Sequence, residues 1–79
     1  PNPFNPATTI HYSITSPMNV TVTLHDLLGR EVMMLQQPEL QPSGEYRIEI
    51  DGSALGSGIY LLRLATDAGI QTQKITLVK

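Results

Sequence analysis

The sequence contains no cysteine and no tryptophan, and only 15% of its residues carry a charge. A chain without cysteine forms no disulfide, has no thiol nucleophile and offers no thiolate ligand to zinc. Five Lys and Arg stand against seven Asp and Glu, for a formal net charge of -2. Nucleic acids and anionic membranes attract strongly basic surfaces, so we expect no nucleic acid partner. No apolar run approaches the roughly 18 residues of a transmembrane helix.

The chain is also short. Its 79 residues make one domain or part of one, and a chain of this size buries about 60% of its unfolded surface. Such a domain has one thin core and little room for a deep active-site cleft. The hydrophobic fraction of 41% favours a packed fold over disorder. The sequence begins with Pro1 rather than with methionine, and we interpret residues 1–79 as a single domain of a longer protein.

Apolar and polar residues alternate over most of the chain. Ile10, Tyr12 and Ile14, for example, are separated by polar residues, which places an apolar side chain on one face at every second position. No segment has the sustained i, i+3, i+4 spacing of an amphipathic helix. The pattern therefore predicts an all-β, antiparallel β-sandwich of about six to seven strands. The predicted strands cover residues 8–15, 19–25, 30–36, 45–50, 59–66 and 70–78, and a short pairing near residues 2–5 or 53–55 would be the seventh.

In two of these segments, the odd-numbered and the even-numbered residues are both mainly apolar. Residues 32–35 are four apolar residues in succession, and residues 59–65 are apolar on both faces except at Arg63. A strand that is apolar on both faces is normally covered on both. Two interpretations stay open. Loops or the proline-rich N-terminal segment cover the second face, or this face is an exposed apolar patch that meets a partner or a second copy of the chain.

No residues form a recognisable catalytic or metal site. His11 and His25 are out of phase with the apolar residues of their strands and have no metal-binding spacing, so we interpret them as solvated or turn-bonding side chains. Asp51 lacks the alternating acidic partners of a calcium loop, and we expect it to bond backbone amides of its own loop. The glycine-rich residues 56–58 precede a strand rather than the helix that follows a phosphate loop. We therefore predict no enzyme activity, no cofactor and no metal.

Aromatic residues are too few to indicate a carbohydrate-binding platform. The chain has only Phe4, Tyr12, Tyr46 and Tyr60. All three tyrosines are in phase with the Ile and Leu residues of their strands. We therefore predict that their rings lie in the core and that their hydroxyl groups reach its rim.

Five segments are distinctive when they are considered together. They are the proline-rich start at 1–10, an Asp-x-x-Gly-Arg-x-Val core within 24–32, the Pro-x-Gly of 42–44, a Leu-x-x-Gly-x-Tyr-x-x-Arg-Leu segment at 55–64 and a lysine-ended strand at 74–79. In this order they resemble the type A C-terminal sorting domain of the type IX secretion system, which is found on secreted and surface proteins of Bacteroidota. The resemblance covers essentially the full chain. The related immunoglobulin-like domain of flagellar hook-capping proteins shares the loop and the Gly-x-Tyr piece.

The resemblance implies an immunoglobulin-like fold and a non-catalytic function. Residues 1–79 would be a C-terminal sorting domain on a larger secreted protein, which crosses the inner membrane, passes through the periplasm and is recognised by the outer-membrane secretion machinery. In many such proteins a sortase-like peptidase removes the domain and anchors the cargo to surface lipopolysaccharide. The expected location is therefore extracellular or the cell surface. One departure is His25, because this position is usually aromatic in the family.

A folded signal must present a shape, a strand edge or a surface patch, because this one has no charged linear address. We predict that the machinery recognises the basic residues of the last two strands together with the turn that leads into them. The predicted recognition residues are Gly58, Ile59, Tyr60, Arg63, Lys74 and Lys79. Structural roles for these residues stay open: backbone geometry for the glycine, core packing for the tyrosine and edge protection for the lysines.

Two other functions are alternatives. A carbohydrate-binding module appended to an extracellular enzyme would need an exposed row of aromatic side chains. A structural immunoglobulin-like module, similar to the hook-capping domain, would occupy a central position in its parent protein. Whatever the function, a homodimer through apolar strand faces or edges stays open.

Overall fold

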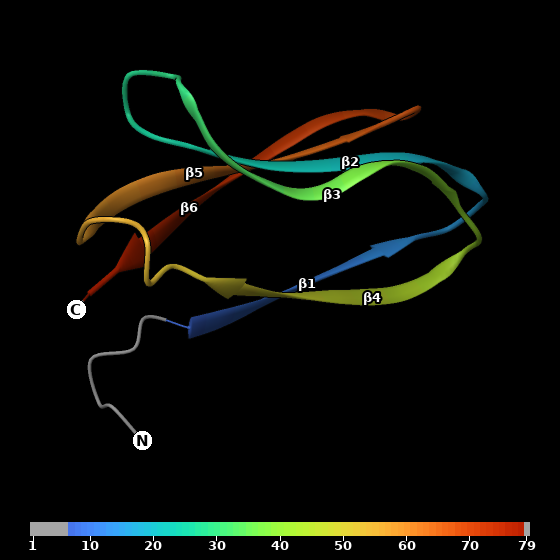
Figure 1. Ribbon diagram of the computed structural model, residues 1–79. Helices are drawn as coiled ribbons and strands as arrows, with labels where there is room; N and C mark the ends of the chain where they lie inside the picture. Colours follow the sequence, from blue (N-terminus) through green and yellow to red (C-terminus); the bar gives the residue numbers. More distant parts are fainter. Residues whose placement is uncertain (1–6, 79) are drawn as a thin grey trace.

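The computed structural model describes residues 7–78, which fold into six β-strands in two layers (Figure 1). The two-stranded sheet pairs β1 with β4, and the four-stranded sheet has the order β3-β2-β5-β6, with every pairing antiparallel. The prediction of an all-β, antiparallel sandwich is confirmed. The strands are β1 (Ala7–Ile14), β2 (Met18–His25), β3 (Glu31–Gln41), β4 (Gly44–Asp51), β5 (Gly58–Thr66) and β6 (Gly69–Leu77).

Five of the six strands begin and end within one residue of the prediction, and no seventh strand forms among residues 7–78. Residues 53–55 belong to a turn instead, in which the Leu55 N–H donates a hydrogen bond to the Gly52 carbonyl at 2.9 Å. The predicted pairing at residues 2–5 lies outside the described residues.

The prediction for β3 was wrong at its C-terminal end, because the strand continues to Gln41 rather than ending at residue 36. Pro38 has no N–H for a sheet ladder, but β3 is an edge strand, where proline is tolerated. The pairing of β3 with β2 shifts register at three places. Such bulges turn successive residues toward the same face. This explains how Val32, Met33 and Leu35 all pack against the core while Met34 is 41% exposed.

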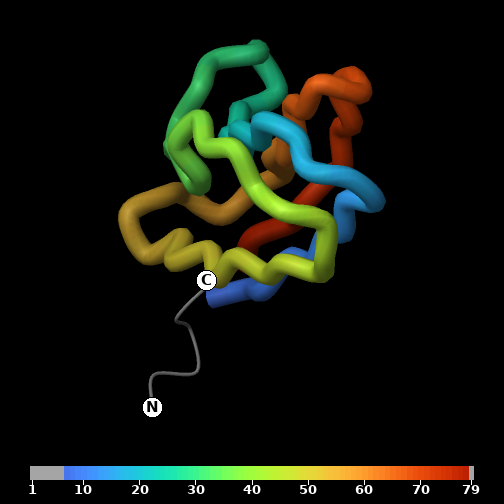
Figure 2. The backbone as a smooth tube through the Cα atoms, turned by 90° about the vertical axis from the view of Figure 1, so that its right-hand side faces the viewer, coloured from blue at the N-terminus to red at the C-terminus, as the bar shows by residue number. Residues whose placement is uncertain are grey.

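The hydrophobic core lies between the two layers. Strand β2 contributes Val20, Val22 and Leu24, each 0% exposed, at alternate positions as predicted. The C-terminal part of β6 approaches the two-stranded layer in both views, and its Ile75 and Leu77 are buried (Figure 1, Figure 2). The buried hydrophobic residues are Ile10, Ile14, Val20, Val22, Leu24, Ile50, Leu62, Ile75 and Leu77.

The second apolar face is exposed in part. Met34 and Ile59 are each 41% exposed, and Ile70 is 66% exposed. Of the two interpretations, these exposures support an exposed apolar patch. Whether the patch meets a partner stays a prediction, and cover by the N-terminal segment would involve residues outside the described ones.

The two sides of the sandwich are bordered by different edge strands. Strand β4 follows β3 across a short turn, so the edges of these strands lie on one side, the β3–β4 side. The edges of β1 and β6 lie on the opposite side, where side chains from both strands line a common groove. We call this the β1–β6 side.

Candidate functional site

The outward surface of the β5–β6 hairpin is the candidate functional site. Cross-strand pairing places Leu61 opposite Lys74 and Arg63 opposite Thr72, and opposed residues in an antiparallel pair project to the same face. Residues of the other parity, such as Leu62 and Ile75, are buried in the core, so this parity points outward. We call this surface the hairpin face: Ile59, Leu61, Arg63, Ala65, Ile70, Thr72, Lys74 and Thr76.

Two cations lie on the hairpin face without an acidic partner. Arg63 and Lys74 are exposed, and neither forms an ion pair within residues 7–78. Apolar side chains accompany them, since Ile59 and Ile70 are 41% and 66% exposed. Exposed apolar residues combined with Arg are typical of protein-binding surfaces.

The fold brings together three of the six predicted recognition residues: Ile59, Arg63 and Lys74 share the hairpin face. Tyr60 lies on the opposite face, packs against the core and donates its hydroxyl proton to the Gly56 carbonyl at 2.7 Å. Lys79 lies outside the described residues.

Gly58, a further predicted recognition residue, begins β5. Its φ is +156°, which residues with a side chain rarely adopt, although the space beside its Cα is open. Backbone geometry at the start of β5 therefore explains this glycine, while any part in recognition stays a prediction.

Asp26 organises the turn between β2 and β3. Its Oδ1 accepts hydrogen bonds from the N–H groups of Leu28 at 2.9 Å and Arg30 at 3.0 Å, and its Oδ2 pairs with Arg30 Nε at 2.8 Å. Gly29 completes the turn with a φ of +87°. Desolvation tends to raise the pKa of Asp26, but the hydrogen bonds from Arg30 and Leu28 outweigh it and hold the pKa below its ordinary 3.8. The Asp-x-x-Gly-Arg motif thus supplies an acceptor, a left-handed turn residue and a counter-ion.

His25 is buried, at 7% exposure, and its ring joins β2 to this turn. Its Nε2 lies 2.8 Å from Thr23 Oγ1 and its Nδ1 lies 3.3 Å from the Gly29 carbonyl oxygen. Because a carbonyl oxygen only accepts, we assign the proton to Nδ1 and let the Thr23 hydroxyl donate to Nε2. The turn-bonding interpretation is confirmed. A solvated His25 was wrong, because β2 is a central strand whose outward side chains are flanked by β3 and β5.

His11, on the edge strand β1, is exposed as expected. Asp51 behaves as predicted and accepts a hydrogen bond from the Ser53 N–H at 3.0 Å. That bond is the main cause that lowers the pKa of Asp51 below 3.8.

The three tyrosines pack against the core as predicted, although each is only half-buried, and their hydroxyl groups form hydrogen bonds. Tyr12 and Tyr46 face each other across β1 and β4 with ring centroids 5.2 Å apart. The Tyr12 hydroxyl donates to Gln41 Oε1 at 2.7 Å, and the Tyr46 hydroxyl donates to the Pro42 carbonyl. Within residues 7–78 no exposed aromatic row is present to support carbohydrate binding. Phe4 lies outside the described residues.

Residues 7–78 contain no group of three or more His, Asp or Glu side chains placed to hold a metal ion. The same residues include no helix with the length and apolar character needed to cross a membrane.

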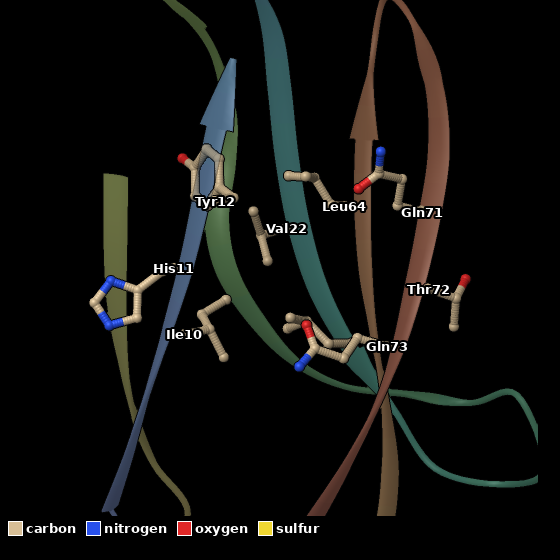
Figure 3. Close-up of a pocket in the computed structure, with 9 residues that line it drawn as sticks. Ile10, His11, Tyr12, Val22, Leu64, Gln71, Thr72 and Gln73 are labelled. Atoms are coloured by element: carbon tan, nitrogen blue, oxygen red, sulfur yellow. The ribbon is translucent and has the colours of Figure 1, made fainter. Parts of the chain in front are cut away.

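Sequence reasoning missed a groove of about 310 Å³ on the β1–β6 side. In Figure 3, Gln71 and Gln73 reach from β6 toward Leu64 and Ile10, whereas Thr72 points away. One signal was present in the sequence: the two glutamines share the parity of the buried Ile75 and Leu77. Gln71 and Gln73 therefore occupy core-facing positions of β6 at which apolar residues would be expected.

The chain matches a known protein family. Residues 1–79 match the family model described as the secretion system C-terminal sorting domain. No curated protein and no solved structure matches the chain.

Proposed function

This chain belongs to the secretion system C-terminal sorting domain family, and from that membership we propose that it directs a cargo protein across the outer membrane through the type IX secretion system. The observation that carries the proposal is the match over residues 1–79. Membership of this family implies a parent protein that is secreted or exported to the cell surface. The domain itself acts by being bound, without catalysis.

The secretion machinery binds the domain through the hairpin face. Arg63 and Lys74 support this assignment, because both cations are exposed and unpaired among the described residues. Arg forms bidentate hydrogen bonds with carboxylates, and adjacent apolar side chains such as Ile59 add contact area. The complementary surface on the machinery is therefore acidic with an apolar centre. Lys79, a further predicted recognition residue, follows the last strand in the sequence.

After export, a sortase-like peptidase cleaves the parent protein ahead of Pro1 and joins the cargo to surface lipopolysaccharide. The support for this step is the family resemblance alone. Mass spectrometry of exported cargo tests it. Loss of residues 1–79 together with a lipid-linked C-terminus is the expected result, and cargo that retains the domain at the surface would contradict it.

The recognition surface is tested with a reporter that carries a signal peptide and this domain, in a bacterium with a type IX system. Arg63→Gln and Lys74→Gln remove the two charges and keep the side-chain length and polarity. We expect each to lower surface delivery about fivefold or more, and the pair to act more strongly, because a charged hydrogen bond at an interface is worth about 1–3 kcal/mol. Lys79→Gln tests the last predicted cation.

The matched control is Arg47→Gln, because Arg47 is an exposed arginine on β4, in the other layer. It should leave delivery unchanged. If the Arg63 and Lys74 variants fold and are delivered like the unmodified reporter, the hairpin face is not the recognition surface. If no reporter with this domain is delivered, the export function itself is wrong.

A further inference from the structure

We propose that the groove on the β1–β6 side binds one extended, uncharged peptide segment of another protein, with apolar side chains at alternate positions, which pairs with the free edge of β1. The groove shares only Ile70 and Thr72 with the hairpin face, and its occupant does not depend on the proposed function.

The backbone of β1 offers the first argument. Strand β1 pairs only with β4, and β6 pairs only with β5. Their edges toward the groove therefore carry N–H and C=O groups that no strand within residues 7–78 satisfies. Only another extended backbone can satisfy such a row at successive positions, which is how peptides add to sheet edges.

The widths of the two layers offer the second argument. Four strands lie over two, so the inner surface of β5 and β6 lacks complete cover. Leu64 has the core-facing parity yet is only half-buried, and Gln71 and Gln73 are exposed. A strand added to β1 would continue the two-stranded layer beneath β5 and β6 and would cover these residues (Figure 1, Figure 3).

The groove sets the length and chemistry of the occupant. A second hollow of about 390 Å³ continues the first, shares Leu64 and Gln71 with it, and reaches Thr15 and Gly69. Together the two hollows follow residues 10–15, a span of roughly 20 Å in extended chain. No Asp, Glu, Lys or Arg lines either hollow. The polar lining comes from Ser, Thr, Gln, Tyr12 and His11, and the apolar lining residues are Ile10, Ile14, Met18, Val22, Leu62, Leu64, Ala68 and Ile70. A neutral, alternately apolar strand of about six residues matches this lining.

Two other occupants fit less well. Residues 1–6 contain three prolines, which lack the N–H that strand pairing needs. A second folded copy of this chain already uses its alternately apolar residues in its own core. An extended segment of another protein has neither restriction.

The test uses the 79-residue domain labelled with ¹⁵N and the capped peptide Lys-Thr-Val-Thr-Ile-Thr-Val-Thr-Lys, whose terminal lysines give solubility. The control peptide has the same sequence with alternate backbone amides N-methylated, which removes the donors along one edge and keeps the side chains. We expect saturable shifts of amide resonances in β1 and slower amide hydrogen exchange along its free edge. The N-methylated peptide should bind at least about tenfold more weakly, because its backbone cannot pair.

Two variants locate the site. Gln71→Glu places a charge at the junction of the two hollows and should weaken peptide binding about tenfold. Gln37→Glu makes the same chemical change at an exposed position on β3 and should bind like the unmodified domain. The ¹⁵N spectrum of each variant checks that it is folded.

Three results would overturn the proposal. Equal binding of the N-methylated peptide would show that strand pairing is not involved. Absence of shifts in β1 up to millimolar peptide would show that the groove does not accept a strand. A dimer of the domain in sedimentation that Gln71→Glu dissociates would identify a second copy as the occupant.

Discussion

On the β3–β4 side of the sandwich both edge strands carry groups that oppose further pairing, whereas on the β1–β6 side such groups are nearly absent. Strand β3 has Pro38, Glu39 and bulges, and β4 has Glu45, Arg47, Glu49 and Asp51. Strand β1 has no proline, carboxylate, Lys or Arg, and β6 has Lys74 as its one charged residue. Proteins protect sheet edges with charges, proline and bulges. One side of the sandwich therefore has the protection that sheet edges usually carry, and the side with the groove lacks most of it.

Strand β6 takes part in two different surfaces. Its outward parity carries Lys74 on the hairpin face, and its inward parity carries Gln71 and Gln73 in the groove. Because alternate residues of a strand point to opposite faces, single substitutions separate the two surfaces. Recognition by the secretion machinery and strand binding are therefore testable independently in the same strand.

The largest expected effect is a difference in the loss of unfolding free energy between two core residues, one on the β3–β4 side and one beside the groove. Ile50 on β4 is 0% exposed, whereas Leu64 is half-buried. Ile50→Ala should lower the free energy of unfolding by about 2–5 kcal/mol, and Leu64→Ala by about 1–2 kcal/mol because part of its surface is already in water. Urea denaturation measures both. Equal losses would mean that Leu64 is fully enclosed and that the β1–β6 side is not open.

A smaller effect is expected at the hydrogen bond that joins β1 to β3. Tyr12→Phe removes the donor to Gln41, whose side chain is 5% exposed, and should lower the free energy of unfolding by about 1–2 kcal/mol. Tyr46→Phe is the matched control. Its partner is the exposed Pro42 carbonyl, which water can satisfy, so the loss should be about 0.5 kcal/mol. Urea denaturation measures both losses, and a larger loss of unfolding free energy for Tyr46→Phe than for Tyr12→Phe would contradict this ranking.

The turn between β2 and β3 predicts a pH dependence. The pKa of Asp26 in the folded chain lies below 3.8, so its charge stabilises the fold above about that pH, and the contribution is lost as the pH falls through the folded-state pKa. Asp26→Asn should therefore be less stable than the unmodified chain at neutral pH, and the difference should close in acid. The effect is small because Arg30 is 73% exposed. Urea midpoints between pH 7 and pH 2 measure it, and a pH-independent difference would exclude the charge as its cause.

The smallest effect on stability is expected for the β3 edge, although association should change. Replacing Pro38 and Glu39 with Thr removes a proline and a carboxylate from this edge, neither of which β1 has. The change should alter the free energy of unfolding by no more than about 0.5 kcal/mol. The double variant should self-associate in sedimentation experiments. Gln73→Lys is the opposite change, because it adds a protective charge to the β6 edge. If the unmodified chain self-associates, this variant should associate less. A monomeric double variant would show that the bulges alone protect β3.

Strand positions were predictable wherever one face of a strand is buried. Alternation located β1 and β4 within one residue, because each apolar position there faces the core. Strand β3 was harder, because its bulges put consecutive apolar residues against the core and its edge position admits Pro38. Burial of His25 was not predictable from its parity, since it depends on the strands that lie on either side of β2.

The sequence by itself determined the strand class, five of the six strand positions, the core-facing tyrosines and the family, because alternation and turn motifs are local properties of short segments. Only the tertiary structure decided that Arg63 and Lys74 share a face from which Tyr60 is excluded, that His25 is buried, and that the β1–β6 side carries a groove. These features depend on which strands pair and on the unequal widths of the two layers. Pairing joins segments that are distant in the chain, and the spacing within any one segment does not specify it.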